Sequence, residues 1–139
     1  MRPNEVRHKL GAGEEVYGLF STLPEPTMVE MIGCAGYDFV ILDTEHTLVD
    51  PQRLENLIRA AETAGLTPFV RVPEADPGAV LRALDAGAMG IVPFCAMSTT
   101  PDRRAQWRAD GVTAFVVGED RDLTARALRG HLARTAGRE

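Results

Sequence analysis

The stretch FVILDTEH, residues 39–46, ends an apolar run with two carboxylates and an imidazole. Asp43 stands three residues before His46, close enough in sequence for its carboxylate to accept a hydrogen bond from one ring nitrogen. Such a contact would fix the imidazole tautomer and leave the other nitrogen as a general base. The alternative is a surface histidine beside loop carboxylates, and the spacing alone favours neither interpretation.

A second polar residue, Arg71, interrupts another apolar run in PFVRVP, residues 68–73. A buried guanidinium without an anionic partner is costly, so this arginine needs one. A structural carboxylate such as Asp43 would serve, and so would a substrate carboxylate held bidentately. The pattern does not choose between these partners. Phe69 and Arg71 are two residues apart in an extended segment, so we expect their side chains on the same face.

Composition narrows the chemistry and the partners. The chain has 139 residues, 45% of them hydrophobic, and a net charge of −5, which predicts one globular domain over 1–139 that binds no nucleic acid. The start of the chain lacks the apolar core of a signal peptide, and no apolar run is long enough to cross a membrane, so we expect a cytoplasmic protein. Lys9, the one lysine in the sequence, stands in a polar segment, which disfavours Schiff-base catalysis.

Short apolar runs alternate with amphipathic stretches, which is typical of a parallel sheet covered by helices. Strands are predicted at 16–23, 37–43, 67–72, 89–94 and 112–118. Helix starts are predicted where a capping residue precedes proline, at Asp50, Asp76 and Thr100. Helix ends are predicted at Gly65, Gly87 and Gly111. A last helix over about 120–135 is expected to turn Ala125, Leu128 and Leu132 inward.

Binding groups in parallel α/β folds collect at the carboxyl ends of the strands. Asp43 and His46 follow one predicted strand, and Arg71 lies near the end of the next, so we expect one cluster at this edge. Glu119 and Asp120 follow the last predicted strand, where we expect them to cap the helix that begins there.

At these residues the sequence resembles the HpcH/HpaI aldolases, a family of class II pyruvate aldolases related to citrate lyase. The matching segments are GYDFVILDTEHTLVD (36–50), TPFVRVPEAD (67–76), LRALDAGAMGIVPF (81–94) and WRADGVTAFVVGEDRDLTARALRGHL (107–132). The start, VYGLFSTLPEP, resembles the first strand of the family, where Phe20 matches an aromatic residue at the pocket mouth.

The resemblance implies a (β/α)8 barrel that forms the enolate of a 2-oxo acid such as pyruvate. It implies that His46 is the base, that Asp43 orients it, and that Arg71 contacts the 2-oxo group or the carboxylate of the substrate. Phe20 would be a further substrate contact. A divalent metal (Mg, Mn or Co) would chelate the 2-oxo acid.

The length departs from this family. A (β/α)8 barrel takes about 250 residues, whereas this chain has 139. The family's middle strands, with its two metal-ligating carboxylates, have no counterpart between Met97 and Trp107, so no metal ligand is assigned. Glu45, Glu74 or Glu119 would serve only in a rearranged site. We therefore expect a truncated (β/α)8-like α/β domain, with about five parallel strands and flanking helices, completed or covered by homo-oligomerisation.

Two functions of different classes follow. The first is a lyase-type enzyme that acts on a 2-oxo acid or related carboxylate through an enolate-like intermediate, repurposed to work without the metal. Its reaction would be retro-aldol cleavage, decarboxylation, isomerisation or cyclisation. The second is a non-catalytic protein that binds a small carboxylate or pairs with a full-length aldolase; a folded but inactive chain is the third interpretation. The joint presence of Asp43, His46 and Arg71 favours the enzyme.

Overall fold

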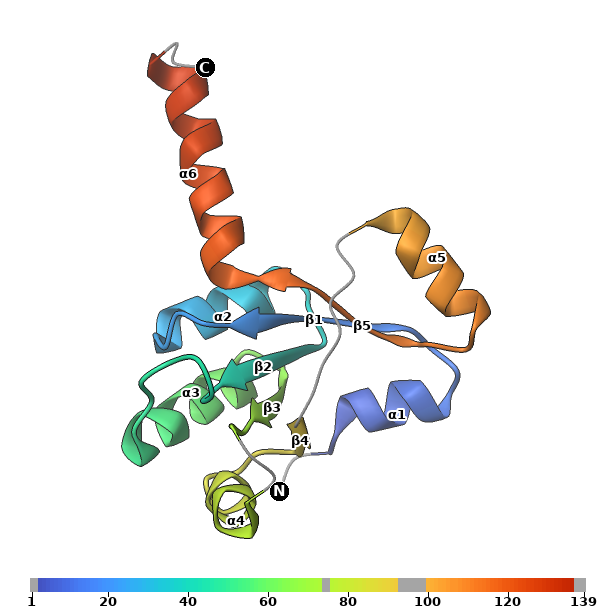
Figure 1. Cartoon of the computed structure of the whole chain (residues 1–139), viewed down its shortest axis with the longest axis vertical. Helices are drawn as coiled ribbons and strands as arrows, with labels where there is room; N and C mark the ends of the chain where they lie inside the picture. The colour runs from blue at the N-terminus through green and yellow to red at the C-terminus, as the bar shows by residue number, and fades with distance from the viewer. Residues whose placement is uncertain (1–2, 74–75, 93–99, 137–139) are drawn as a thin grey trace.

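The computed structural model describes residues 3–73, 76–92 and 100–136, and these form one parallel sheet with helices around it (Figure 1). The strands are β1 (Val16–Ser21), β2 (Phe39–Asp43), β3 (Thr67–Arg71), β4 (Gly90–Val92) and β5 (Ala114–Glu119). The helices are α1 (Glu5–Gly11), α2 (Pro26–Cys34), α3 (Pro51–Thr63), α4 (Pro77–Asp85), α5 (Pro101–Ala109) and α6 (Asp120–Ala136). Each predicted strand is present, and residues 93–94 of the fourth prediction lie outside the described residues.

The order of the strands is β4-β3-β2-β1-β5, so the first strand lies inside the sheet and the last joins its far side. All neighbouring pairs are parallel. The sheet stays open, with β4 and β5 as its two edges, and a closed barrel would need further strands between them. The predicted truncated arrangement of five parallel strands with flanking helices is therefore confirmed.

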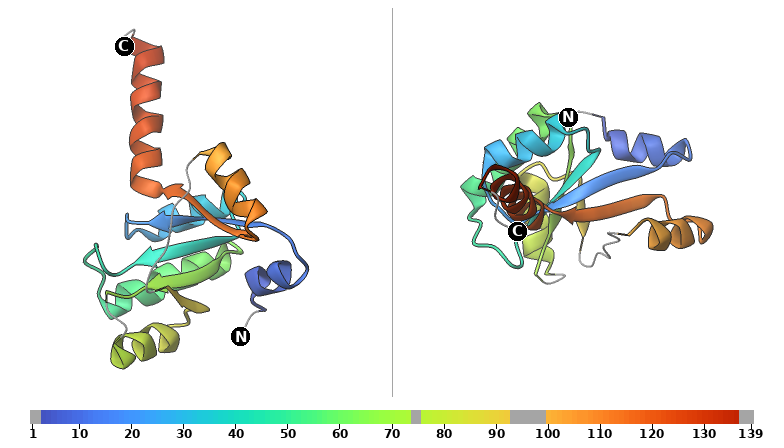
Figure 2. Two further views of the ribbon diagram at one scale, coloured as in Figure 1. Left: turned by 45° about the vertical axis from the view of Figure 1, so that its right-hand side comes forward. Right: turned by 90° about the horizontal axis from the view of Figure 1, so that it is seen from above.

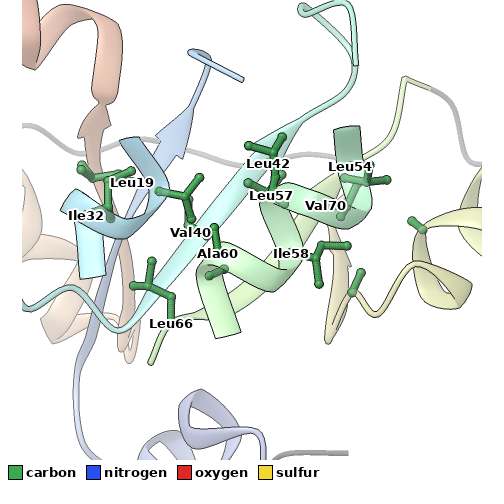
Figure 3. Packing of buried hydrophobic residues seen from close by; sticks show 14 of the residues in the cluster. Leu19, Ile32, Val40, Leu42, Leu54, Leu57, Ile58, Ala60, Leu66 and Val70 are labelled. Atoms are coloured by element: carbon green, nitrogen blue, oxygen red, sulfur yellow. The ribbon is translucent and has the colours of Figure 1, made fainter. Parts of the chain in front are cut away.

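Helices α2, α3 and α4 cover the outer face of the sheet and bury the larger apolar cluster. Figure 3 shows this cluster. Leu54, Leu57 and Ile58 of α3 pack with the strand residues Val40, Leu42 and Val70. The sequence predicts this packing because these α3 residues recur at helical spacing. Asp50 caps α3 as predicted, since its carboxylate accepts a hydrogen bond from the backbone N–H of Arg53 at 2.8 Å.

The inner face carries a smaller apolar cluster that includes Phe20, Phe39 and Phe69. Phe39 and Phe69 meet edge to face, with ring centroids 5.5 Å apart. Gly18 and Gly90 make room for these rings, because a Cβ at either position would collide with the neighbouring phenylalanine. Side chains alternate between the two faces along a strand. Asp43 and Arg71, two residues after Ile41 and Phe69, therefore point to this same inner face at the ends of β2 and β3.

Helix α6 departs from the sequence prediction. Leu128 and Leu132 were expected to face inward, but they are 65% and 49% exposed. Figures 1 and 2 show the reason: α6 extends away from the sheet, so no other described element packs along the outer part of the helix. Among the described residues, no helix has the length and apolar composition needed to cross a membrane.

Candidate functional site

A hollow of about 350 Å³ opens on the inner face of the sheet, at the carboxyl ends of the strands. Its lining residues are Phe20, Thr22, Asp43, His46, Arg71, Glu119 and Arg121. The four residues predicted for the site therefore lie together. A larger hollow of about 430 Å³ between α3 and α4 is lined mostly by apolar side chains, so it offers less chemistry.

Asp43 and Arg71 form the centre of the site. They are direct neighbours in the register of β2 and β3, which places both side chains on the inner face. The guanidinium binds the carboxylate bidentately, with Nε 3.0 Å from Oδ1 and Nη2 2.5 Å from Oδ2. Its Cζ lies 4.6 Å from the centroid of the Phe20 ring, which is buried beneath it. Asp43 is thus a structural carboxylate partner of Arg71, which was one of the two partners considered from the sequence.

The loop after β2 is tied to the same carboxylate. Oδ1 of Asp43 accepts hydrogen bonds from the backbone N–H groups of Glu45 at 3.0 Å and His46 at 3.2 Å. The Thr44 hydroxyl donates to the carbonyl of Arg71 at 2.6 Å. Burial alone would raise the pKa of Asp43, but the hydrogen bonds from Arg71 and from these amides outweigh it and hold the pKa below its usual value. Asp43 is therefore a fixed anion at neutral pH.

The contact made by the His46 ring differs from the one expected. Nδ1 lies 3.6 Å from Oδ2 of Asp43, too far for the hydrogen bond that the sequence spacing suggested. Nη2 of Arg71 lies between them, 2.7 Å from Nδ1. A guanidinium only donates, so Nδ1 is the acceptor and a neutral ring carries its proton on Nε2. Asp43 thus orients His46 through the backbone amide, and Arg71 orients the ring. The side chain of His46 is 64% exposed and open to the hollow.

A divalent cation does not fit this cluster as it is arranged. Asp43, Glu45 and His46 each offer one ligand atom, and these atoms lie within 4.8 Å of one another. The guanidinium of Arg71 already lies among them, with Nε 3.3 Å from Oε2 of Glu45 and Nη2 against the other two. A metal ion there would meet a second positive charge at contact distance. Of the other two carboxylates considered above, Glu119 does not belong to this cluster and Glu74 lies outside the described residues.

The opposite wall of the hollow comes from the junction of β5 and α6. Asp120 is 2% exposed, and its carboxylate accepts hydrogen bonds from the Ser21 hydroxyl at 3.0 Å and the Thr22 amide at 2.9 Å. It also accepts from the amide of Leu23 and from the amide of Arg121, at 3.2 and 2.7 Å. Asp120 therefore joins the start of α6 to the loop after β1. This role differs from the helix cap that was expected of Glu119 and Asp120, since in α6 the Asp120 carboxylate accepts only from the amide of the next residue, Arg121, among the described hydrogen bonds.

Glu119 and Arg121, on either side of Asp120, face the hollow. Nη2 of Arg121 donates to the carbonyl of Thr22 at 2.9 Å. Within the described residues, no carboxylate lies within ion-pair distance of Arg121, and the side chain of Glu119 has neither a hydrogen bond nor an ion pair. The sequence prediction missed Arg121 and Thr22. The signal was the polar run GEDR directly after an apolar strand, at the same sheet edge as DTEH.

Comparison with known proteins gives a consistent family assignment. The sequence model of the family "HpcH/HpaI aldolase/citrate lyase" matches residues 16–120. The 5-keto-4-deoxy-D-glucarate aldolase of Salmonella paratyphi A is 34% identical over 93 residues, which are 66% of this chain and 36% of that enzyme. The chain therefore spans about a third of the length of the curated relatives that it matches.

Solved structures agree with this assignment. An HpcH/HpaI aldolase/citrate lyase family protein from Burkholderia cenocepacia J2315 is 37% identical, with a TM-score of 0.61 over 74% of this chain and 40% of that one. The citrate synthase SbnG matches with a TM-score of 0.87 over 95% of this chain and 97% of that one. Its sequence is 24% identical, so this second likeness concerns the fold alone.

Proposed function

The chain belongs to the HpcH/HpaI aldolase/citrate lyase family, and from this membership we propose that it is a lyase-type enzyme. Its substrate is a 2-oxo acid or a related carboxylate, and its reaction passes through an enolate-like intermediate. The observation that supports this proposal best is the contact of 2.7 Å between Arg71 and His46 at the wall of the hollow. It puts a fixed positive charge and a proton-transfer group beside the same substrate atoms.

Arg71 stabilises the intermediate in this proposal. When a proton leaves the carbon next to the carbonyl, the C–H electron pair forms a C=C bond and negative charge moves to the carbonyl oxygen. A guanidinium already fixed at that oxygen lowers the barrier, because no group has to reorganise as the charge develops. The bidentate bond to Asp43 and the ring of Phe20 hold Arg71 in place.

His46 accepts the proton. In the geometry described above, its Nδ1 lone pair points at Nη2 of Arg71. A substrate oxygen that takes over this N–H as acceptor would release Nδ1, which becomes the base as the substrate binds. Asp43 acts as a positioning residue, since it binds both Arg71 and the amide of His46.

The proposed reaction does not depend on a divalent metal, although enzymes of this family commonly use one. Arg71 occupies the space among the three candidate ligands and supplies the positive charge itself. A carboxylate-binding protein without turnover, or a partner subunit of a full-length aldolase, is the second candidate function. The two arginines that line the hollow, Arg71 and Arg121, would serve carboxylate binding without turnover as well.

Exchange of the methyl protons of pyruvate in heavy water, followed by NMR, tests the proposal. The wild type is measured with EDTA and then with Mg²⁺, Mn²⁺ or Co²⁺, beside His46→Ala. His131→Ala is the matched control, because His131 is exposed on α6 and lies outside the lining of the hollow. We expect exchange in EDTA that His46→Ala abolishes and His131→Ala preserves. Exchange only with metal would refute the metal-independent mechanism, and binding without exchange would favour the second candidate.

We also propose that the chain functions as a homo-oligomer. β4 and β5 are open edges of the sheet, and Leu128 and Leu132 leave an apolar stripe on α6 without a partner among the described residues. Open edges and apolar stripes favour association of identical chains. Sedimentation velocity should give at least a dimer, which Leu128→Glu should weaken, whereas a monomer at micromolar concentration would contradict the proposal.

A further inference from the structure

We propose that Arg121 binds the carboxylate of the substrate while Arg71 contacts its 2-oxo oxygen. This assignment rests on the proposed function, and it names the group that recognises the acid. Arg71 and Arg121 both line the hollow, but they come from opposite walls and differ in how their charge is balanced.

Before a substrate binds, two carboxylates of the protein, those of Asp43 and Glu45, already lie beside the guanidinium of Arg71. Asp43 binds it through two contacts, and Oε2 of Glu45 lies 3.3 Å from its Nε. A substrate carboxylate placed at Arg71 would therefore approach two carboxylates of the protein as well. In the bound substrate the carbonyl oxygen carries only a partial charge, so it suits this position better than a carboxylate does, and the guanidinium then meets the charge that develops on this oxygen as the enolate forms.

The guanidinium of Arg121 has fewer negative charges around it than that of Arg71. The one hydrogen bond that the Arg121 guanidinium makes among the described residues goes to the neutral carbonyl of Thr22, at 2.9 Å. That bond uses Nη2, and no carboxylate in residues 3–73, 76–92 or 100–136 balances the charge of the guanidinium. An arginine fork binds a carboxylate through two parallel N–H donors, which is stronger and more selective than a contact to a single donor.

The backbone of Arg121 is fixed in advance. Its amide donates to the buried carboxylate of Asp120, which also binds Ser21 and Thr22 of the facing loop. This brings the guanidinium to the mouth of the hollow before any ligand arrives, and less ordering is then needed on binding. Glu119, a half-buried carboxylate on the same wall, opposes an anion near β5, so the guanidinium of Arg121 is the group on this wall that would attract one.

The test compares two ligands of similar shape, pyruvate and the neutral pyruvamide, by NMR titration. The variants are Arg121→Ala, Arg121→Lys and the control Arg129→Ala, since Arg129 is exposed farther along α6 and outside the lining of the hollow. We expect Arg121→Ala to weaken pyruvate about tenfold or more, as the loss of a hydrogen bond between charged groups predicts, and to leave pyruvamide almost unchanged. Arg121→Lys should recover part of the loss, and Arg129→Ala should change neither ligand.

Several results would overturn the assignment. They are an equal effect of Arg121→Ala and Arg129→Ala on pyruvate, an equal loss for pyruvate and pyruvamide, and a wild type that does not bind pyruvate. The proposed function fails separately from this assignment. If wild-type protein binds pyruvate through Arg121 but catalyses no exchange, the function is wrong and the assignment stands. If exchange depends on His46 but its KM for pyruvate is unchanged in Arg121→Ala, the function stands and the assignment is wrong.

Discussion

An arginine–carboxylate pair lies at each end of the sheet, and the two pairs use the same parts. At the amino end, Nη2 of Arg108 lies 2.6 Å from Oε2 of Glu15, and its Cζ lies 5.8 Å from the ring centroid of Phe115. The Tyr17 hydroxyl donates to the same carboxylate. Hydrogen bonds from Arg108 and Tyr17 hold the pKa of Glu15 below its usual value. The carboxyl-end pair likewise joins an arginine, a carboxylate with a lowered pKa and an aromatic ring.

The two pairs differ in how deeply their side chains are buried. The side chains of Arg108 and Glu15 are 48% and 28% exposed, whereas those of Arg71 and Asp43 are 19% and 0% exposed. Water solvates the first pair and screens its attraction. The second pair lies in a poorly solvated place, where each charge depends on the other. Depth therefore turns an ordinary ion pair into a rigid element of the site, able to present a guanidinium in one orientation.

Removal of one carboxylate from each pair gives the largest expected contrast. Asp43→Asn removes the bidentate carboxylate partner of a largely buried guanidinium and should lower the free energy of unfolding by about 3 kcal/mol. Glu15→Gln removes a half-buried carboxylate from the more exposed pair and should shift the urea midpoint only slightly. Urea denaturation followed by circular dichroism measures both. Equal shifts for the two variants would mean that depth does not distinguish the pairs.

The sequence was sufficient for the strands and for much of the site. Apolar runs predict the strands, and capping residues before proline predict the helix starts. Because polar groups gather at the carboxyl ends of parallel strands, Asp43, His46 and Arg71 were expected to lie together. The predicted inward orientation of Leu128 and Leu132 was wrong for a physical reason. Helical spacing shows which residues share a face, but not whether another element covers that face, and here none of the described elements does.

The contacts inside the site were harder to predict. The spacing of Asp43 and His46 suggested a direct hydrogen bond, yet Nη2 of Arg71, from a neighbouring strand, lies between the two groups. Arg121 was missed because its role depends on a comparison of charges across the hollow, not on a motif. A surplus of charge is a property of the folded arrangement, since it requires knowing which carboxylates lie within reach of each guanidinium.

The pH dependence of stability sharpens the same comparison with a smaller effect. The pKa of Asp43 is lower in the folded chain than its ordinary value of about 3.9, so the ionised carboxylate stabilises the fold above that pH. This contribution is lost as the pH falls through the folded pKa. The gap in urea midpoint between wild type and Asp43→Asn should therefore be wide at pH 6 and narrow towards pH 3. A gap that stays constant over this range would contradict the assignment of the lowered pKa.

The smallest expected effect concerns Glu119, the carboxylate in the hollow that makes no ion pair within the described residues. Glu15 is neutralised by Arg108, whereas Glu119 faces the hollow without an ion pair among the described residues. If an anion binds at Arg121, Glu119 repels it, and Glu119→Gln should tighten pyruvate binding about two- to threefold, as expected for an exposed charge interaction. Asp122→Asn is the control, because Asp122 lies three residues farther on, in α6, and pairs with Arg126 at 2.7 Å. Unchanged binding in Glu119→Gln would contradict the repulsion, and weaker binding would show that this carboxylate contributes a contact to the ligand.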